Sequence, residues 1–226
     1  MNESKTNNHK KLHSTIEHTS LRPDLVEEGV INLCDEAIEY GFHGVCLNPI
    51  NVSTAVTHTI CTDLNVISVA GFPTGSGGTK AKIEETFFAA TNGANEIDIV
   101  IDIRAAKEGR FSDISKEIKA IIGELDQNIL IKVIIETGLL NKKEREFASL
   151  AAIDAGAQFI KTSTGFWTPA VTPEEVSSLR KIVGPFIGIK ASGGIRDLRT
   201  IKALIEAGAN RIGTSTAVEI FKTITS

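Results

Sequence analysis

The sequence predicts an α/β protein with the (β/α)8 architecture of a TIM barrel, folded as a single domain. Two observations predict this fold class. First, four helix-like segments each end at a glycine and are followed at once by an apolar segment, at Gly41, Gly93, Gly156 and Gly208. Glycine adopts the left-handed conformation at a helix C-terminus at little cost. Second, the spacing of these glycines corresponds to about 30 residues per strand and helix, the length of a βα unit.

Apolar segments fill the positions in which the eight strands of such a barrel are expected. They cover residues 14–19, 44–48, 66–72, 96–103, 130–137, 159–164, 186–192 and 210–215. Several are runs of valine and isoleucine, as expected for parallel strands that helices cover on the outside. The competing architecture is a doubly wound open sheet, and the absence of a GxGxxG motif after the first strand weakens its dinucleotide-binding version.

Two of the segments between the strands have the spacing of amphipathic helices. The first begins at a candidate N-cap, Asn141, and ends at Gly156. Its predicted stripe consists of Phe147, Leu150, Ala151 and Asp154. The stripe of the second helix consists of Leu198, Ile201, Leu204 and Ile205.

The composition limits the class of protein. The chain has 226 residues, of which 42% are hydrophobic, and its net charge of −4 argues against a nucleic-acid partner. No window reaches the roughly 18 consecutive apolar residues that a membrane span needs. Residues 1–12 are polar and predict an N-terminal tail rather than a secretory signal, which leaves residues 13–226 for a cytoplasmic catalytic barrel. The three cysteines, Cys34, Cys46 and Cys61, have no metal-ligand spacing and are interpreted as buried reduced thiols.

Side-chain alternation places charged residues inside the predicted barrel, because one parity of each strand faces the interior. In residues 96–103 the outward parity belongs to Ile97, Ile99, Ile101 and Ile103. The inward parity then belongs to Glu96, Asp98, Val100 and Asp102. By the same rule the following strands direct four more charged side chains inward, those of Lys132, Glu136, Lys161 and Lys190.

The lysines on neighbouring strands suggest a chemical function. Lys161 and Lys190 are expected to lie close together, and two like charges disfavour each other's protonation. A lysine that loses its proton is a nucleophile and forms a Schiff base with a carbonyl compound. We therefore expect Lys161 to be a catalytic amine. For Lys132, which is expected opposite Asp98, a structural ion pair and a catalytic role are equally supported.

Glycine-rich segments after the last two predicted strands suggest a phosphate site. In TIM barrels these two loops often bind phosphate through backbone N–H groups at a helix N-terminus. The candidate residues are Gly193, Gly194, Gly213 and Ser215. Thr164, at the end of the strand that carries Lys161, is a further candidate for substrate binding.

These motifs together resemble the deoxyribose-phosphate aldolase family, from about residue 15 to residue 216. The segments that carry the resemblance are VCLNP (45–49), GFPTG (71–75), NEIDIVIDI (95–103), KVIIETGLL (132–140), FIKTSTGF (159–166) and KASGGIR (190–196). The family implies a class I aldolase in a (β/α)8 barrel, without metal or cofactor. It implies reversible cleavage of 2-deoxy-D-ribose 5-phosphate to acetaldehyde and D-glyceraldehyde 3-phosphate, in deoxyribonucleoside catabolism. It also implies a homo-oligomer, a dimer or a tetramer.

The resemblance implies a role for each candidate residue. Lys161 matches the Schiff-base lysine, Lys190 the lysine that tunes it, Asp98 the acid that transfers protons with a water, and Lys132 the lysine that orients this acid. Phosphate binding is implied for Gly193, Gly194 and Ser215.

The sequence departs from the usual family pattern at four places. Glu17 stands where an aspartate is usual, and Asp102 where a neutral residue such as asparagine is usual. Phe166 stands where some members have a phosphate-binding lysine, as in another branch of the family. The C-terminus lacks the tyrosine with which some members end, because Tyr40 is the one tyrosine in the chain.

Three alternatives remain open at this stage. One is a Schiff-base barrel enzyme that acts on another sugar phosphate. Another is a non-catalytic barrel that binds a phosphorylated metabolite. The third is a metal-dependent lyase, which the scattered histidines do not favour. They are His9, His13, His18, His43 and His58.

Overall fold

The computed structural model describes residues 12–125, 128–167 and 169–225. Eight parallel strands pair in sequence order into one closed barrel, and the last strand pairs with the first. This confirms the predicted fold class. The strands are β1 (Ile16–Ser20), β2 (Gly44–Leu47), β3 (Asn65–Ala70), β4 (Glu96–Val100), β5 (Leu130–Ile134), β6 (Phe159–Lys161), β7 (Gly188–Ser192) and β8 (Arg211–Thr214). The predicted tail, residues 1–12, lies outside the described residues except for its last residue.

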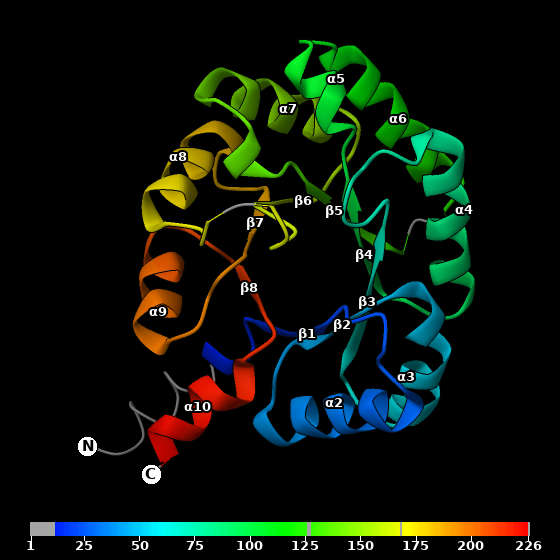
Figure 1. The fold of residues 1–226 in the computed structure, drawn as a ribbon, viewed down its shortest axis with the longest axis vertical. Coiled ribbons are helices and arrows are strands. Elements are labelled where there is room, and N and C mark those ends of the chain that lie inside the picture. Colours follow the sequence, from blue (N-terminus) through cyan, green and yellow to red (C-terminus); the bar gives the residue numbers. More distant parts are fainter. Residues whose placement is uncertain (1–11, 126–127, 168, 226) are drawn as a thin grey trace.

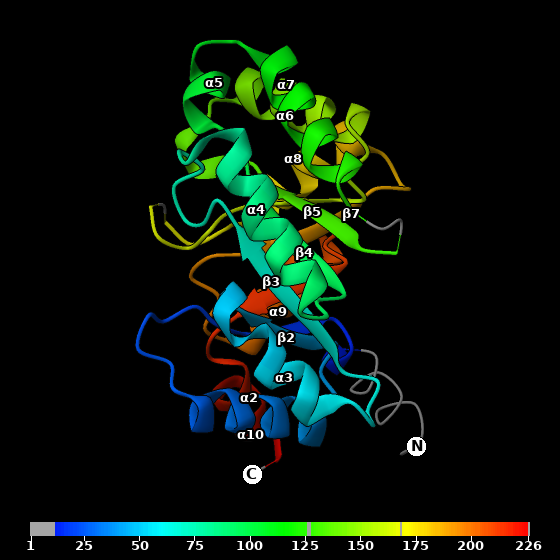
Figure 2. The same ribbon diagram turned by 90° about the vertical axis from the view of Figure 1, so that its right-hand side faces the viewer.

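Helices form a ring around the barrel (Figure 1). They are α2 (Glu27–Tyr40), α3 (Val52–Thr59), α4 (Gly78–Thr91), α5 (Ile103–Lys107), α6 (Phe111–Gly123), α7 (Lys142–Asp154), α8 (Pro173–Val183), α9 (Leu198–Glu206) and α10 (Ala217–Thr225). Two short 3-10 helices, η1 (Pro49–Asn51) and η2 (Thr137–Leu139), follow β2 and β5. The side view shows α4 lying across β3 and β4 (Figure 2). None of the helices in the described part of the chain is long and apolar enough to cross a membrane.

The glycines that predicted the repeat adopt the expected conformation. The φ angles of Gly41, Gly93, Gly156 and Gly208 are 63°, 98°, 105° and 112°. Each glycine follows a helix and precedes the strand that the chain enters next. The glycine spacing therefore predicted the repeat correctly, and each of the four glycines has the positive φ on which that prediction rests.

Several strands are shorter than predicted, and the difference moves one candidate side chain. β4 ends at Val100, and Asp102 accepts a hydrogen bond from the Ala105 backbone N–H at 3.1 Å as the N-cap of α5. The prediction that Asp102 faces the barrel interior is therefore wrong. An N-cap aspartate satisfies an otherwise unpaired N–H of the first helical turn. The chain therefore enters a helix at the point where the alternation rule extends the strand.

Helix α7 has the predicted ends but not the predicted buried face. Asn141 and Glu144 form a reciprocal capping box, which confirms Asn141 as N-cap. The buried residues are instead Ala148, Ser149 and Ala152. Phe147 and Leu150 are exposed, so the predicted stripe is wrong. In α9 the predicted stripe is confirmed, because Ile201 and Leu204 are buried and its other two members pack against the core.

The barrel interior differs from the layer between strands and helices. The outer layer is an extended apolar core that includes Ile97, Ile99 and Val133. Inside the barrel the apolar cluster is small and consists of Cys46, Ile67 and Val69 with partly buried neighbours. Charged side chains occupy much of the remaining interior. Cys34 and Cys46 are buried free thiols as predicted, whereas Cys61 is exposed, so that part of the prediction is wrong.

Candidate active site

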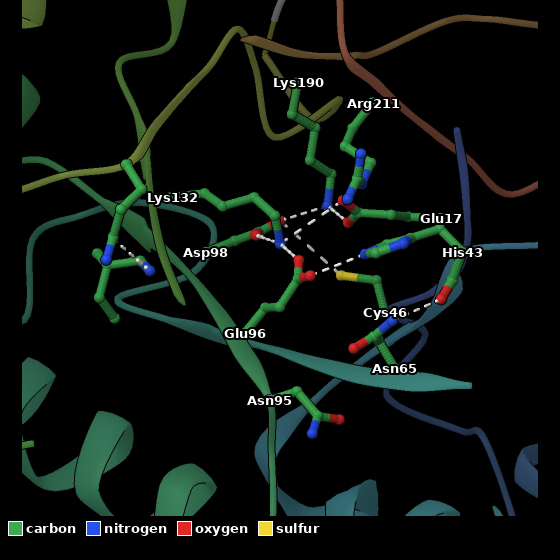
Figure 3. A network of polar contacts seen from close by, with 12 residues as sticks. Glu17, His43, Cys46, Asn65, Asn95, Glu96, Asp98, Lys132, Lys190 and Arg211 are labelled. Atoms are coloured by element: carbon green, nitrogen blue, oxygen red, sulfur yellow. Dashed lines mark hydrogen bonds and ion pairs between the residues drawn. The ribbon is translucent and has the colours of Figure 1, made fainter. Parts of the chain in front are cut away.

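Six buried charged side chains from five strands meet inside the barrel. Figure 3 labels all of them except Lys161. They are Glu17 from β1, Glu96 and Asp98 from β4, Lys132 from β5, Lys161 from β6 and Lys190 from β7. The strand register sets Asp98 opposite Lys132, and Lys161 opposite Lys190. The alternation of side chains along each strand thus brings the predicted catalytic residues together.

Asp98 is the centre of this cluster. Its Oδ2 lies 2.7 Å from Lys161 Nζ and 2.6 Å from Lys190 Nζ, and its Oδ1 lies 3.1 Å from Lys132 Nζ. Burial raises the pKa of the Asp98 carboxyl, but the three lysines outweigh burial and hold this pKa well below its usual value. Asp98 is therefore an ionised hydrogen-bond acceptor shared by three amines.

Lys190 is held in its charged form. Its ammonium contacts both Asp98 and Glu17. Burial lowers the pKa of Lys190, but these two carboxylates outweigh burial and raise the pKa well above its usual value. The expectation that neighbouring lysines disfavour each other's protonation is therefore wrong for Lys190. A shared carboxylate between two lysines supplies a counter-charge that sequence spacing does not reveal.

A second group of ligand-type atoms lies deeper in the barrel. Glu17, His43 and Glu96 each place one such atom within 4.8 Å of the others. The Lys132 ammonium already contacts Glu96 and lies 3.6 Å from Glu17 Oε1. A lysine thus occupies the position of a cation there. Sequence reasoning missed His43 because it precedes β2, where the alternation rule does not apply.

Cys46 is another residue whose position the sequence did not indicate. Its thiol points into the barrel, and Sγ lies 4.0 Å from Asp98 Oδ2. Burial raises the pKa of this thiol, so it stays protonated beside the carboxylate.

A cavity of about 970 Å³ opens at the C-terminal ends of the strands, and Lys161 lines it. The predicted phosphate-site and substrate residues line the same cavity. They are Thr164, Gly193, Gly194, Gly213 and Ser215. Lys161 is only 3% exposed, so its amine is reached through this cavity rather than from open solvent.

Glycine has a different structural role at each of two of these positions. Gly194 has a φ of 68°, and a Cβ there would lie 2.6 Å from Ala170 Cβ. Gly213 belongs to β8, and a Cβ there would lie 3.0 Å from Lys190 Cε. Gly194 thus shapes the loop after β7, whereas Gly213 leaves room for the Lys190 side chain.

The loop after β6 is held by a residue that lies outside any strand. Glu136, with a φ of 53°, accepts a hydrogen bond from the Thr164 backbone N–H at 2.9 Å. Phe166 from the same loop packs edge-on against Phe72, with 5.4 Å between ring centroids. Lys161 Nζ lies 5.9 Å from the centre of the Phe72 ring. Apolar rings therefore form one wall beside the amine.

The fold and this cluster define a (β/α)8-barrel protein with a lysine-centred candidate active site. The comparisons with known proteins narrow this class. The DeoC/LacD family aldolase model matches residues 9–223. The chain therefore belongs to the DeoC/LacD family of aldolases and is an aldehyde-lyase.

Individual relatives agree with this assignment. The chain is 48% identical over 205 residues to the deoxyribose-phosphate aldolase of Alkaliphilus oremlandii, covering 91% of this chain and 92% of the relative. It is 46% identical over 208 residues to that of Thermococcus gammatolerans, with the same shares covered. Among solved structures, the aldolase QR15 is 39% identical, with a TM-score of 0.89 over 95% of this chain and 96% of that one. The tetrameric deoxyribose phosphate aldolase of Aeropyrum pernix is 32% identical, with a TM-score of 0.86 over 96% and 92%.

Proposed function

We propose that this chain reversibly cleaves 2-deoxy-D-ribose 5-phosphate to acetaldehyde and D-glyceraldehyde 3-phosphate, through a Schiff base on Lys161. One observation carries the proposal. The Lys161 amine is buried, 2.7 Å from Asp98 Oδ2, and lines the cavity that Gly193, Gly194 and Ser215 also line. This arrangement supports an amine nucleophile at one end of a phosphorylated substrate and an anion site at the other. The names of the relatives support the substrate.

Binding places the open-chain sugar along the cavity. Its phosphate accepts hydrogen bonds from backbone N–H groups of the loops after β7 and β8, where glycine permits close approach. Its C1 carbonyl then lies at Lys161, and Thr164 lines the same cavity. A phosphate that is anchored at the far end also orients the reacting carbon.

Schiff-base formation begins when Lys161 has given up a proton. The neutral amine attacks C1, the C1 oxygen leaves as water, and an iminium forms. Asp98, with a water and Lys190, takes the proton of the C3 hydroxyl. The C2–C3 bond then breaks, its electron pair passes into the enamine, and glyceraldehyde 3-phosphate leaves. The enamine takes a proton at C2, and hydrolysis of the iminium releases acetaldehyde and regenerates Lys161.

The test is mass spectrometry of the intact protein after incubation with acetaldehyde and borohydride, followed by peptide mapping. We expect a single reduced adduct on the peptide that carries Lys161, and no adduct in Lys161→Ala. Lys82→Ala is a matched control, because Lys82 is buried and paired to Glu117 outside the barrel. That variant should still form the adduct. A folded wild-type protein without an adduct would show that the proposed mechanism is wrong, and a panel of sugar phosphates then tests other substrates.

We further propose that residues 13–226 act as one catalytic domain in cytoplasmic deoxyribonucleoside catabolism. A homo-oligomer, a dimer or a tetramer, is part of this proposal. The tetramer described for the Aeropyrum pernix relative supports it. Light scattering coupled to size exclusion measures the molar mass, and a value equal to that of one chain would contradict the proposal.

A further inference from the structure

His43 occupies a fixed position at the end of the barrel opposite the cavity. It lies between α2 and β2, directly before the first strand residue, Gly44. Its backbone N–H donates to the Ile16 carbonyl at 2.8 Å, and its carbonyl accepts from the Asn65 backbone N–H at 3.2 Å. These bonds tie His43 to β1 and β3. Its imidazole points from there to the centre of the barrel (Figure 3).

An unbroken chain of polar contacts runs from this imidazole to the Lys161 amine. His43 Nε2 lies 2.7 Å from Glu96 Oε1, and the other oxygen of Glu96 contacts the Lys132 ammonium. Lys132 Nζ lies 3.1 Å from one oxygen of Asp98, and Lys161 Nζ lies 2.7 Å from the other. The side chain of His43 is 14% exposed, whereas those of Glu96 and Lys132 are 6% and 0% exposed. At the end of the barrel opposite the cavity, His43 is thus the most exposed side chain in this series of contacts.

The direction of the His43 hydrogen bond follows from the charge of Glu96. Burial raises the pKa of Glu96, but the hydrogen bond from His43 and the charge of Lys132 outweigh burial and lower this pKa to about 2. An ionised carboxylate only accepts hydrogen bonds. The Nε2 atom of His43 therefore carries the proton and donates to Glu96.

The cluster holds equal numbers of carboxylates and lysines. Three carboxylates, Glu17, Glu96 and Asp98, face the three lysines of the site. Lys132 is shared among all three carboxylates. The hydrogen bond that His43 donates to Glu96 offsets part of the negative charge of this carboxylate. Glu96 therefore attracts Lys132 less strongly, and Lys132 is available to neutralise Asp98. Arg211, at the start of β8, is the other charged side chain labelled in this network (Figure 3).

We propose that His43 is a positioning residue for the aldol reaction and sets, through Glu96 and Lys132, how strongly Asp98 holds the Lys161 amine. The inference rests on the proposed function of Lys161. Without the His43 donor, Glu96 draws Lys132 towards itself and away from Asp98. Asp98 then holds the Lys161 ammonium more tightly, and Lys161 releases its proton at a higher pH.

The experiment compares the pH dependence of two readouts in His43→Leu and His43→Gln. The first readout is kcat/KM, and the second is the rate of borohydride trapping of acetaldehyde on Lys161. In His43→Leu we expect the acid limb of both profiles to move to higher pH by about half a unit, a roughly threefold loss on that limb. In His43→Gln an amide N–H can still donate to Glu96, so most of the shift should disappear. KM at the pH optimum should stay unchanged, because His43 is remote from the cavity.

His58→Leu is the matched control. His58 Nε2 lies 2.7 Å from Asp35 Oδ1, but this pair lies outside the barrel network. This variant should keep the wild-type profile. Acid limbs of His43→Leu that coincide with the wild type, or that move to lower pH, would overturn the inference. If His43→Leu does not fold, His43→Gln and Glu96→Gln decide: the inference requires Glu96→Gln, which frees Lys132 for Asp98, to move the acid limb to lower pH, and His43→Gln not to move it in that direction. A wild-type protein without a Lys161 adduct would instead overturn the proposed function.

Discussion

Asp98 Oδ2 lies 2.7 Å from Lys161 Nζ, inside a barrel that buries both groups. One oxygen of the carboxylate is thus in direct contact with the amine that the proposed reaction uses. We expect Asp98→Asn to lower kcat by about 10²- to 10⁴-fold, the usual contribution of acid–base assistance. Lys161 should still form a borohydride-stable adduct, because the amine itself is intact. Single-turnover trapping and steady-state assays on the same preparation measure both quantities, and a variant with wild-type kcat would contradict the role of Asp98.

Glu17→Gln should move the pH profile in the direction opposite to His43→Leu. Glu17 contacts Lys190 and lies near Lys132. The variant loses the negative charge of Glu17, so three lysines face two carboxylates. A lost negative charge disfavours the ammonium form of neighbouring lysines, and a shift of about one pH unit to lower pH is expected for the acid limb of kcat/KM. The measurement is the same pH series, and an unshifted limb would show that Glu17 does not act on Lys161.

Gly194→Ala should weaken the use of phosphorylated substrate selectively. The new Cβ would lie 2.6 Å from Ala170 Cβ at a φ of 68°, which displaces the loop after β7. We expect KM for 2-deoxy-D-ribose 5-phosphate to rise by about tenfold, the equivalent of about 1.4 kcal/mol, and kcat/KM for unphosphorylated 2-deoxy-D-ribose to stay near wild type. Gly184→Ala is the control, since its φ is 71° and a Cβ there meets no atom within 4 Å. Equal losses with both sugars would argue against a phosphate site in this loop.

Glu96 should contribute to stability in a defined pH window. Its pKa is about 2 in the folded protein, against an ordinary value of 4.5. A lowered carboxyl pKa stabilises the fold above the unfolded value, and this contribution is lost as the pH falls towards the folded value. Urea unfolding of the wild type should therefore show stability that falls between about pH 5 and pH 2, with a weaker fall in Glu96→Gln. Glu206→Gln, which removes an exposed carboxylate, should keep the wild-type slope, and identical slopes in all three proteins would contradict the prediction.

Lys132→Ala should convert the deep carboxylate cluster into a metal site. The variant leaves Glu17, His43 and Glu96 within 4.8 Å of one another without the ammonium that separates them. Removing one partner of a buried ion pair typically costs about 3–5 kcal/mol, and Zn²⁺ should restore much of the lost thermal stability. In the wild type neither Zn²⁺ nor EDTA should change Tm, because Lys132 occupies the cluster. The double variant Lys132→Ala/His43→Ala is the control, and Zn²⁺ stabilisation that is equal in wild type and variant would refute this prediction.

The sequence by itself determined the barrel and the lysines and aspartate that its strands direct into the interior. Both results depend on repetition: the glycines after α2, α4, α7 and α9 have a positive φ, which other residues adopt at a cost, and a strand places every second side chain on the same face. Lys132, Lys161 and Lys190 lie on strands, so the period of two assigned them correctly. Asp98 was assigned by the same rule.

The tertiary structure decided what lies outside this periodicity. His43 precedes its strand, Asp102 caps a helix beyond the end of β4, and Glu136 turns into a left-handed conformation after β5. It also decided the charge states, because the pKa of Lys190 depends on two carboxylates from strands distant in the sequence. Local patterns do not reveal which side chains from non-adjacent strands meet inside a closed barrel. Electrostatic interactions act through space, so the balance between burial and counter-charge is fixed only when the barrel closes.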